Sequence, residues 1–203
     1  EGEQCELEMV AGGCDKDCHR RRFKTKLIAM GMCGYDRVLI EPSGIFDMDE
    51  FFDALHEEPL DRWYQIGNVI AVVDAGLDEK MSEETDYILA SEVADAGCIV
   101  LSKTQEASEK SIENTVKHLN RALEAVHCKR KFGEDEIIRK DWEQFETEDF
   151  ERILNSGYIA EDYEKMSLDE KEVFKSLYFM DLEISGKELR DAAQKIMQDP
   201  ACG

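Results

Sequence analysis

Three short apolar segments in the first half of the chain do not alternate with polar residues. They are RVLI (37–40), NVIAVV (68–73) and CIVL (98–101). Continuous segments rich in valine and isoleucine are typical of strands that are buried on both faces of a parallel sheet. The pattern therefore predicts three strands of one such sheet.

Helical patterns separate and follow these segments. The pattern beginning at Ser82 opens with an N-cap residue and acidic residues in its first turn, which favour a helix start. Apolar residues then recur every three or four positions from Ile112 to Val126, and this spacing places one apolar face on a long helix. The alternation of strands and helices predicts a three-layer α/β sandwich with right-handed crossovers. The expected elements are helices at 47–55, 82–96 and 108–126 and a further strand at 135–139.

The last third of the chain has a different character. Residues 142–172 are acidic and only weakly periodic, and we interpret them as a helical connector with short pieces such as TEDFERIL. The segment 173–184 is predicted to form a strand, and 185–199 a helix ending before Pro200. A strand and a helix cannot form a stable domain alone. We therefore expect an α/β domain over 1–141, the connector over 142–172 and the beginning of a second domain over 173–203. We also expect a fragment cut at both ends.

The charge balance limits the classes of partner. The chain has 47 acidic and 25 basic residues and a formal net charge of -22, so its field repels nucleic acids and anionic lipids. No apolar run approaches the ~20 residues that span a bilayer, and no basic and apolar leader opens the sequence. We expect a soluble, cytoplasmic protein with no nucleic-acid or membrane partner. The basic cluster from His19 to Lys26 either contacts a phosphate or forms a solvated helix face. The other histidines are expected on helix surfaces, at His56, His118 and His127.

Seven cysteines, an odd and scattered set, indicate reduced thiols rather than the disulfide framework of a secreted protein. Cys98 and Cys128 lie in or beside segments that we expect to be buried. Cys14, Cys18 and His19 bring two thiolates and an imidazole together in sequence, and these ligands suit Zn²⁺ or Co²⁺. The alternative is that they are ordinary reduced cysteines in a loop.

Polar residues follow each predicted strand. In parallel α/β sheets ligands bind beyond the carboxyl ends of the strands, so we expect a binding site there. An acid at the end of a buried strand can hold Mg²⁺, usually through water. A glycine three positions later lets a backbone N–H approach a γ-phosphate closely. The three strand ends are Glu41-Pro42-Ser43-Gly44, Asp74-Ala75 and Ser102-Lys103-Thr104-Gln105.

Taken in order, these motifs resemble the CobW-like family of GTPases, SIMIBI-class P-loop NTPases related to the urease and hydrogenase nickel-insertion G proteins. The E-x-x-G motif of the family matches residues 41–44, its strand ending in VVDA matches 72–75, and its ADxIVLNKxD segment matches 94–105. Upstream, ELEMVAGGCDKDC is similar to the segment leading to the metal motif of the family. Downstream, SLYFMDLEISGKELRDAAQKI resembles the start of the CobW C-terminal domain.

The resemblance implies a P-loop NTPase-like nucleotide-binding domain over 1–141 and a nucleotide-dependent metallochaperone. Such a protein binds GTP with Mg²⁺, hydrolyses it slowly and delivers a metal such as zinc or cobalt to a client metalloprotein. Glu41 then positions Mg²⁺ or water, and Gly44 senses the γ-phosphate. The implied base contacts are Ser102, Lys103 and Gln105, and the implied metal ligands are Cys14, Cys18 and His19.

Three departures from the family pattern leave other functions open. The 203 residues contain no G-x-x-x-x-G-K-S/T motif. In the family this motif precedes the cysteine motif, so an N-terminal truncation would remove it. Gln105 replaces the acid that reads guanine, and this removes a charge-assisted hydrogen bond. The metal motif is Cys-x-x-x-Cys-His rather than C-x-C-C. One alternative is a non-catalytic metal-binding or protein-interaction module on a degenerate GTPase scaffold, serving a cobalamin- or corrinoid-dependent system. Another is a structural domain whose strand-end polar residues have no function.

Overall fold

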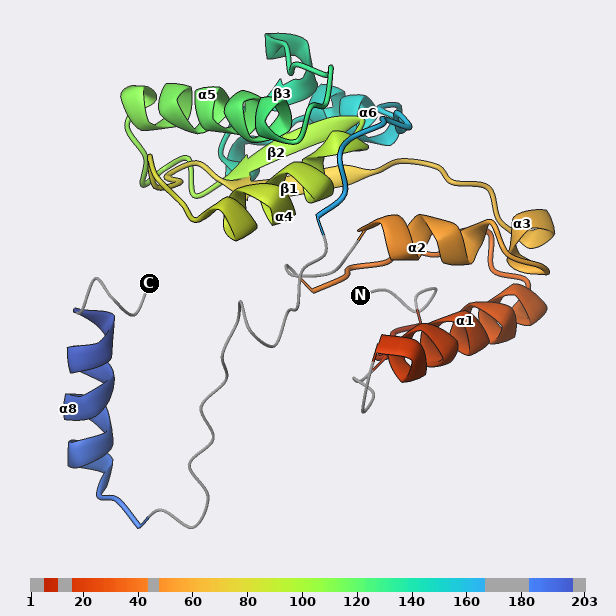
Figure 1. Ribbon diagram of the computed structural model, residues 1–203, viewed down its shortest axis with the longest axis horizontal. Helices are drawn as coiled ribbons and strands as arrows, with labels where there is room; N and C mark the ends of the chain where they lie inside the picture. Colours follow the sequence, from red (N-terminus) through yellow and green to blue (C-terminus); the bar gives the residue numbers. More distant parts are fainter. Residues whose placement is uncertain (1–5, 11–15, 44–47, 167–182, 199–203) are drawn as a thin grey trace. The chain divides into compact units, whose positions relative to one another are not determined.

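The computed structural model (Figure 1) describes residues 6–10, 16–43, 48–166 and 183–198. The chain divides into two compact units, Glu1–Leu168 and Asp169–Gly203. In the first unit the order is α1 (Lys16–Cys33), α2 (Met48–Leu55), α3 (Leu60–Trp63), β1 (Ile70–Asp74), α4 (Glu83–Ala94), β2 (Cys98–Ser102), α5 (Glu109–Ala125), β3 (Ile137–Ile138) and α6 (Thr147–Leu154). The described helix of the second unit is α8 (Gly186–Met197), which begins after Ser185 as an N-cap.

The sheet of the first unit is parallel, with the order β1-β2-β3. β1 and β2 pair in register from Ile70↔Cys98 to Asp74↔Ser102, and β2 pairs with β3 through Ile99↔Ile137 and Val100↔Ile138. The predicted α/β class with a parallel sheet is therefore confirmed. The strand predicted at 135–139 is shorter than expected, because residues 134–136 form a 3₁₀ turn before it.

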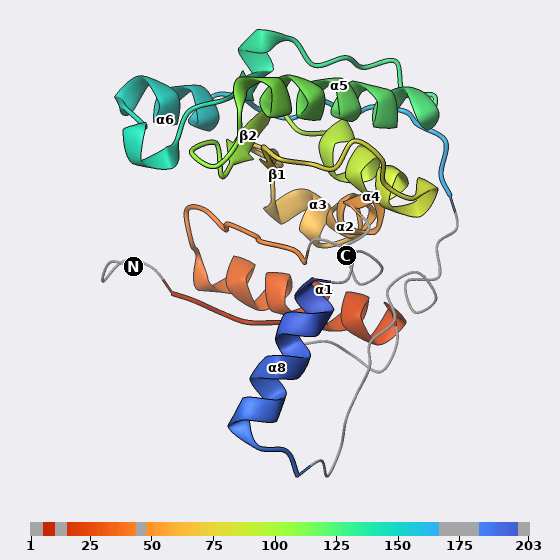
Figure 2. The ribbon, with the colours of Figure 1, turned by 90° about the vertical axis from the view of Figure 1, so that its left-hand side faces the viewer.

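Helices α4 and α5 cover one face of this sheet, and α6 lies on the other face (Figure 1 and Figure 2). Both covering helices begin where the sequence predicts. Ser82 Oγ accepts a hydrogen bond from the Thr85 N–H, and Ser108 Oγ accepts one from the Ser111 N–H. These caps satisfy backbone donors that the first helical turn leaves without partners. The core between helices and sheet is aliphatic, and its most buried members include Val93, Ile99, Leu101, Leu119 and Leu123.

Helix α6 and the segment after it are joined to the sheet by hydrogen bonds to backbone groups. Asn68 Nδ2 donates a hydrogen bond to the Leu154 carbonyl at 2.8 Å, and Ala96 and Tyr158 form an antiparallel bridge. A Cβ atom built on Gly97 would lie 2.3 Å from the Gly157 carbonyl oxygen. This approach is possible only for glycine, so Gly97 is required where the chain after α6 crosses the start of β2.

His118 is buried, and the prediction that it lies on a helix surface is wrong. It is 2% exposed, its Nδ1 lies 2.9 Å from the Asp78 carbonyl, and its Nε2 lies 2.6 Å from Asp86 Oδ1. The reason is that this face of α5 packs against α4 and the loop before it. Burial of Cys98 and Cys128 is confirmed, and burial raises the pKa of both thiols.

Helices α1, α2 and α3 contact one another. Phe23 of α1 packs against Phe51 of α2, with ring centroids 5.4 Å apart, and the Tyr64 hydroxyl donates to the Leu27 carbonyl at 2.7 Å. The basic cluster lies on α1, and the Glu57 carboxylate accepts hydrogen bonds from Arg20 and Lys24 of this cluster. These bonds lower the pKa of Glu57, with Lys24 contributing most. Part of the basic face is therefore already paired within the protein.

Residues 37–40 do not form the predicted strand. They have no regular secondary structure, and Leu39 is 88% exposed. A strand requires a neighbour for its backbone hydrogen bonds, and the described residues place a cavity, rather than a strand, between this segment and β1. Most of the strand predicted at 173–184 lies outside the described residues, which resume at 183. Across the described ranges, no helix has the length and apolar character needed to cross a membrane.

Candidate functional site

The carboxyl ends of β1 and β2 form one polar edge. Asp74 and Ser102 are register partners, and Lys103 Nζ donates a hydrogen bond to Asp74 Oδ2 at 2.6 Å. The Gly76 N–H donates to the other carboxylate oxygen of Asp74 at 2.8 Å. The Lys103 ammonium, followed by the Gly76 N–H, lowers the pKa of Asp74, and Asp74 in turn raises the pKa of Lys103. The ion pair stays charged at neutral pH and fixes the direction of the lysine side chain.

A tight turn follows β2 and presents the predicted base-contacting residues. Lys103 has a φ of 55°, a left-handed conformation that is uncommon for a residue with a side chain and is worth attention where ligands bind. The Glu106 N–H donates to its carbonyl at 3.0 Å and closes the turn. Ser102 Oγ donates to the Val73 carbonyl at 3.3 Å, and Gln105 is exposed. Lys103 and Gln105 therefore project toward solvent beyond the sheet edge.

The neighbouring Thr104 differs from Lys103 and Gln105 in that its hydroxyl is buried. Its Oγ1 atom is buried and has no hydrogen-bond partner among the described residues. A buried hydroxyl without a partner is costly. The turn after β2 thus offers a lysine stem and an exposed amide. This donor and acceptor set fits the edge of a nucleobase.

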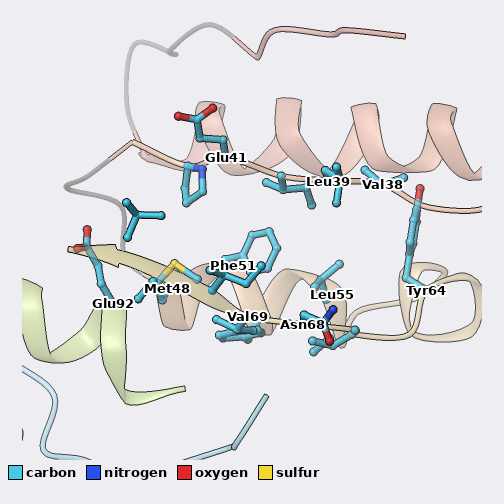
Figure 3. A pocket seen from close by; sticks show the side chains of 18 of the residues that line it. Val38, Leu39, Glu41, Met48, Phe51, Leu55, Tyr64, Asn68, Val69 and Glu92 are labelled. Atoms are coloured by element: carbon cyan, nitrogen blue, oxygen red, sulfur yellow. The ribbon is translucent and has the colours of Figure 1, made fainter. Parts of the chain in front are cut away.

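Glu41 borders a different space from the Asp74–Lys103 pair. It is exposed and lines a cavity of about 440 Å³ between residues 38–43 and β1, together with α2 and part of α4 (Figure 3). The cavity walls are mostly aliphatic and aromatic, and β1 forms one of them. Glu41 and β1 thus border the same space, whereas Gly44 lies outside the described residues.

Glu92 of α4 is a residue of this cavity that the sequence analysis missed. It lines the cavity (Figure 3), and burial raises its pKa to about 7. The available signal is its position within ASEVADA, where the surrounding residues other than Asp95 are small or apolar and, in the structure, buried. A carboxyl group in an apolar helix face is a frequent sign of a functional or ligand-linked position.

The predicted metal ligands are only partly described. Cys18 and His19 lie in the first turns of α1, and so in a helix rather than a loop, whereas Cys14 lies outside the described residues. Adjacent helical residues point about 100° apart, so Cys18 and His19 face different directions. Within the described ranges, no three histidine, cysteine or acidic side chains are grouped to hold a metal ion.

Comparison with known protein families shows which family the chain belongs to. The family model of the CobW/HypB/UreG nucleotide-binding domain matches residues 2–132. The chain belongs to this family. No curated protein and no solved structure is significantly similar to it. The match confirms the CobW-like resemblance. The matched residues include Glu41, the Asp74–Lys103 pair and the turn that contains Gln105.

Proposed function

We propose that the protein is a CobW-type, GTP-binding metallochaperone of the cytoplasm, which couples GTP hydrolysis to delivery of zinc or cobalt to a client metalloprotein. The observation that carries the proposal is the Asp74–Lys103 pair at the carboxyl edge of the sheet, inside the matched nucleotide-binding domain. In this proposal residues 1–141 form the nucleotide-binding domain, residues 142–172 form a connector, and residues 173–203 are the beginning of a C-terminal domain.

The turn after β2 is proposed to hold the base. The Lys103 stem packs along the plane of the ring, and its ion pair with Asp74 keeps it extended for this contact. The Gln105 side-chain oxygen accepts a hydrogen bond from a guanine N–H, and Ser102 adds a polar contact. A neutral amide makes a weaker bond here than a carboxylate does. Guanine is therefore preferred over adenine, but by a modest factor.

Glu41 and Gly44 are proposed to act at the phosphates. The Glu41 carboxylate orients a water molecule or binds Mg²⁺ through water, and the Gly44 N–H contacts the γ-phosphate. Mg²⁺, when bound, would neutralise part of the phosphate charge. The water attacks the γ-phosphorus in line, the bond to the β–γ bridging oxygen breaks, and GDP and phosphate leave, while the protons of the water pass to the released phosphate and to solvent. Because the 203 residues contain no G-x-x-x-x-G-K-S/T motif, we expect this chain by itself to bind GTP weakly and hydrolyse it slowly.

The cargo metal is proposed to bind at the beginning of α1. Cys14, Cys18 and His19 are the proposed ligands, because thiolate and imidazole suit zinc and cobalt. Two observations favour a second candidate function, a non-catalytic metal-binding or protein-interaction module. These are Gln105 in place of an acid and the missing phosphate-binding motif.

Calorimetric titration with Mg²⁺·GTP, and with Mg²⁺·ATP for comparison, separates the two candidates. We expect saturable binding that prefers GTP and that Lys103→Ala removes. Lys110→Ala, which changes an exposed lysine at the start of α5, is the matched control and should bind as the unmodified chain does. Binding of neither nucleotide would rule out the GTPase function for this chain. The metal site is tested separately by the zinc affinity, measured by competition with a chromophoric chelator. The affinity of the unmodified chain is compared with that of the Cys18→Ser variant.

A further inference from the structure

The loop that follows β1, residues 75–79, is held by one face of α5. Polar side chains three or four positions apart share this face of the helix, and they reach backbone carbonyls of the loop and the Glu79 carboxylate. These side chains are Ser111, Asn114, Thr115, His118 and Arg121. Because the loop begins directly after Asp74, its position bears on the polar edge of the sheet.

Two of these side chains act on a single peptide group, the one that joins Ala75 and Gly76. Its carbonyl oxygen accepts a hydrogen bond from Thr115 Oγ1 at 2.9 Å and a longer one from Ser111 Oγ at 3.4 Å. Its N–H donates to Asp74 Oδ1 at 2.8 Å. A peptide group is planar and rigid, so a bond that fixes its carbonyl also fixes the direction of its N–H. The orientation of the Asp74 carboxylate is therefore linked to α5.

The same peptide group connects α5 to Lys103. Asp74 Oδ1 is bonded to the Gly76 N–H, and Asp74 Oδ2 accepts a hydrogen bond from Lys103 Nζ at 2.6 Å. With both oxygens bonded, the carboxylate keeps one orientation, and this orientation sets the direction in which the lysine stem extends. Thr115 therefore acts on Lys103 indirectly, through the peptide group and Asp74.

The burial of Thr115 makes the role of its hydroxyl specific. Thr115 is fully buried on the face of α5 that also carries Leu119 and Leu123. A threonine within a helix can satisfy its hydroxyl with a carbonyl three or four positions earlier in the same helix. Here the hydroxyl bonds to the Ala75 carbonyl outside the helix. Valine has nearly the same shape, so filling this space does not by itself require a hydroxyl.

We propose that Thr115, assisted by Ser111, is a positioning residue for nucleotide binding, which holds the peptide group after Ala75 so that Asp74 directs the Lys103 stem toward the nucleobase. Only the last of these links, between Lys103 and a base, rests on the function proposed above. The earlier links are hydrogen bonds within the protein, and they can be measured without a nucleotide.

Hydrogen exchange of the Gly76 amide, followed by NMR in the complete chain without nucleotide, tests the earlier links. Thr115→Val removes the hydroxyl and releases the peptide group, so the Gly76 amide should exchange about tenfold faster. Its proton resonance should also move away from the position of an amide bonded to a carboxylate. Thr115→Ser retains the hydroxyl and should restore both signals. A Gly76 amide that Thr115→Val leaves unchanged would overturn the proposal.

Calorimetric titration with Mg²⁺·GTP tests the last link. Thr115→Val should bind GTP roughly fivefold more weakly, an effect of the size of one hydrogen bond, and Thr115→Ser should bind as the unmodified chain does. Ser91→Ala is the matched control, because Ser91 is also a buried helix hydroxyl but bonds to the Ile88 carbonyl of its own helix. It should change neither Gly76 exchange nor affinity. Equal GTP affinity of Thr115→Val and the unmodified chain would overturn the positioning role.

The two measurements separate a failure of this role from a failure of the proposed function. If the unmodified chain binds neither GTP nor ATP, the proposed function fails, and the role of Thr115 in nucleotide binding fails with it. Faster Gly76 exchange in Thr115→Val would then still support the link between α5 and Asp74. Ser111→Ala, at a half-buried position, should produce the same change in a smaller size. If Thr115→Val does not fold, unchanged Gly76 exchange in Ser111→Ala would overturn the proposal.

Discussion

Replacing Glu92 with glutamine is expected to stabilise the protein at pH 8 and to remove much of the pH dependence of its stability between pH 5 and 8. Burial raises the pKa of Glu92 in the folded protein from its ordinary value of 4.5 to about 7. Between these values the folded state holds a proton that the unfolded state has lost. The contribution of Glu92 to stability is therefore greatest below pH 4.5, falls as the pH rises through 7 and is constant above that.

The magnitude follows from the size of this change. At ~1.4 kcal/mol for each unit of pKa, a rise from 4.5 to about 7 corresponds to ~3 kcal/mol in the free energy of unfolding. Glu92 is only half-buried, so solvent screening reduces the expected effect to about 2 kcal/mol. Glutamine keeps the size of the side chain and cannot ionise, so the variant avoids the cost of a buried charge at pH 8.

Urea unfolding followed by circular dichroism at pH 5 and pH 8 measures this difference. Glu124→Gln, at an exposed position of α5, is the matched control and should change stability equally at both pH values. The reasoning is refuted if Glu92→Gln loses as much stability between pH 5 and 8 as the unmodified protein does. That result would mean that Glu92 remains ionised and solvated in the folded state.

Three further changes test the site and the fold. Gln105→Asp should increase the preference for GTP over ATP about tenfold, because a carboxylate makes a charge-assisted bond to guanine, and an unchanged calorimetric preference would place the base elsewhere. Lys103→Ala should change the free energy of unfolding only slightly, since its pair with Asp74 is largely exposed, yet remove GTP binding; a large loss in urea unfolding would make the pair structural. Gly97→Ala should destabilise the fold by more than ~3 kcal/mol, because its Cβ would meet the Gly157 carbonyl. A thermal melt like that of the unmodified chain would contradict this contact.

The elements that the sequence predicts well are those whose signals are local. The apolar segments at β1 and β2, and the serine caps of α4 and α5, depend on residues close together in the chain. The segment 37–40 has an equally strong strand pattern but no strand structure. Its pattern records suitability for a buried sheet, whereas strand formation also requires a neighbour at hydrogen-bonding distance. The sequence cannot supply that second condition.

The candidate site shows the same division. Polar residues at the ends of two strands could be predicted, and the parallel register of β1 and β2 brings them to one edge. The ion pair between Asp74 and Lys103 could not be predicted, because it depends on the left-handed backbone of Lys103. The burial of His118 and of Glu92 depends on residues distant in sequence. His118 does not differ from an ordinary polar helix position until the helices are packed, and the sequence sets Glu92 apart only by the small and apolar residues near it.

Because Cys98 and Cys128 are buried, the rate at which their thiols react reports how often the core opens. Thiol reagents attack the thiolate, so two thiols that are shielded from solvent and have raised pKa values react slowly while the core is closed. Among the four cysteines that the structure describes, Cys33, at the exposed end of α1, is labelled first. Cys98 lies in the central strand and Cys128 just after α5. The interval between early and late alkylation therefore measures how often β2 and α5 separate, without the introduction of a new cysteine.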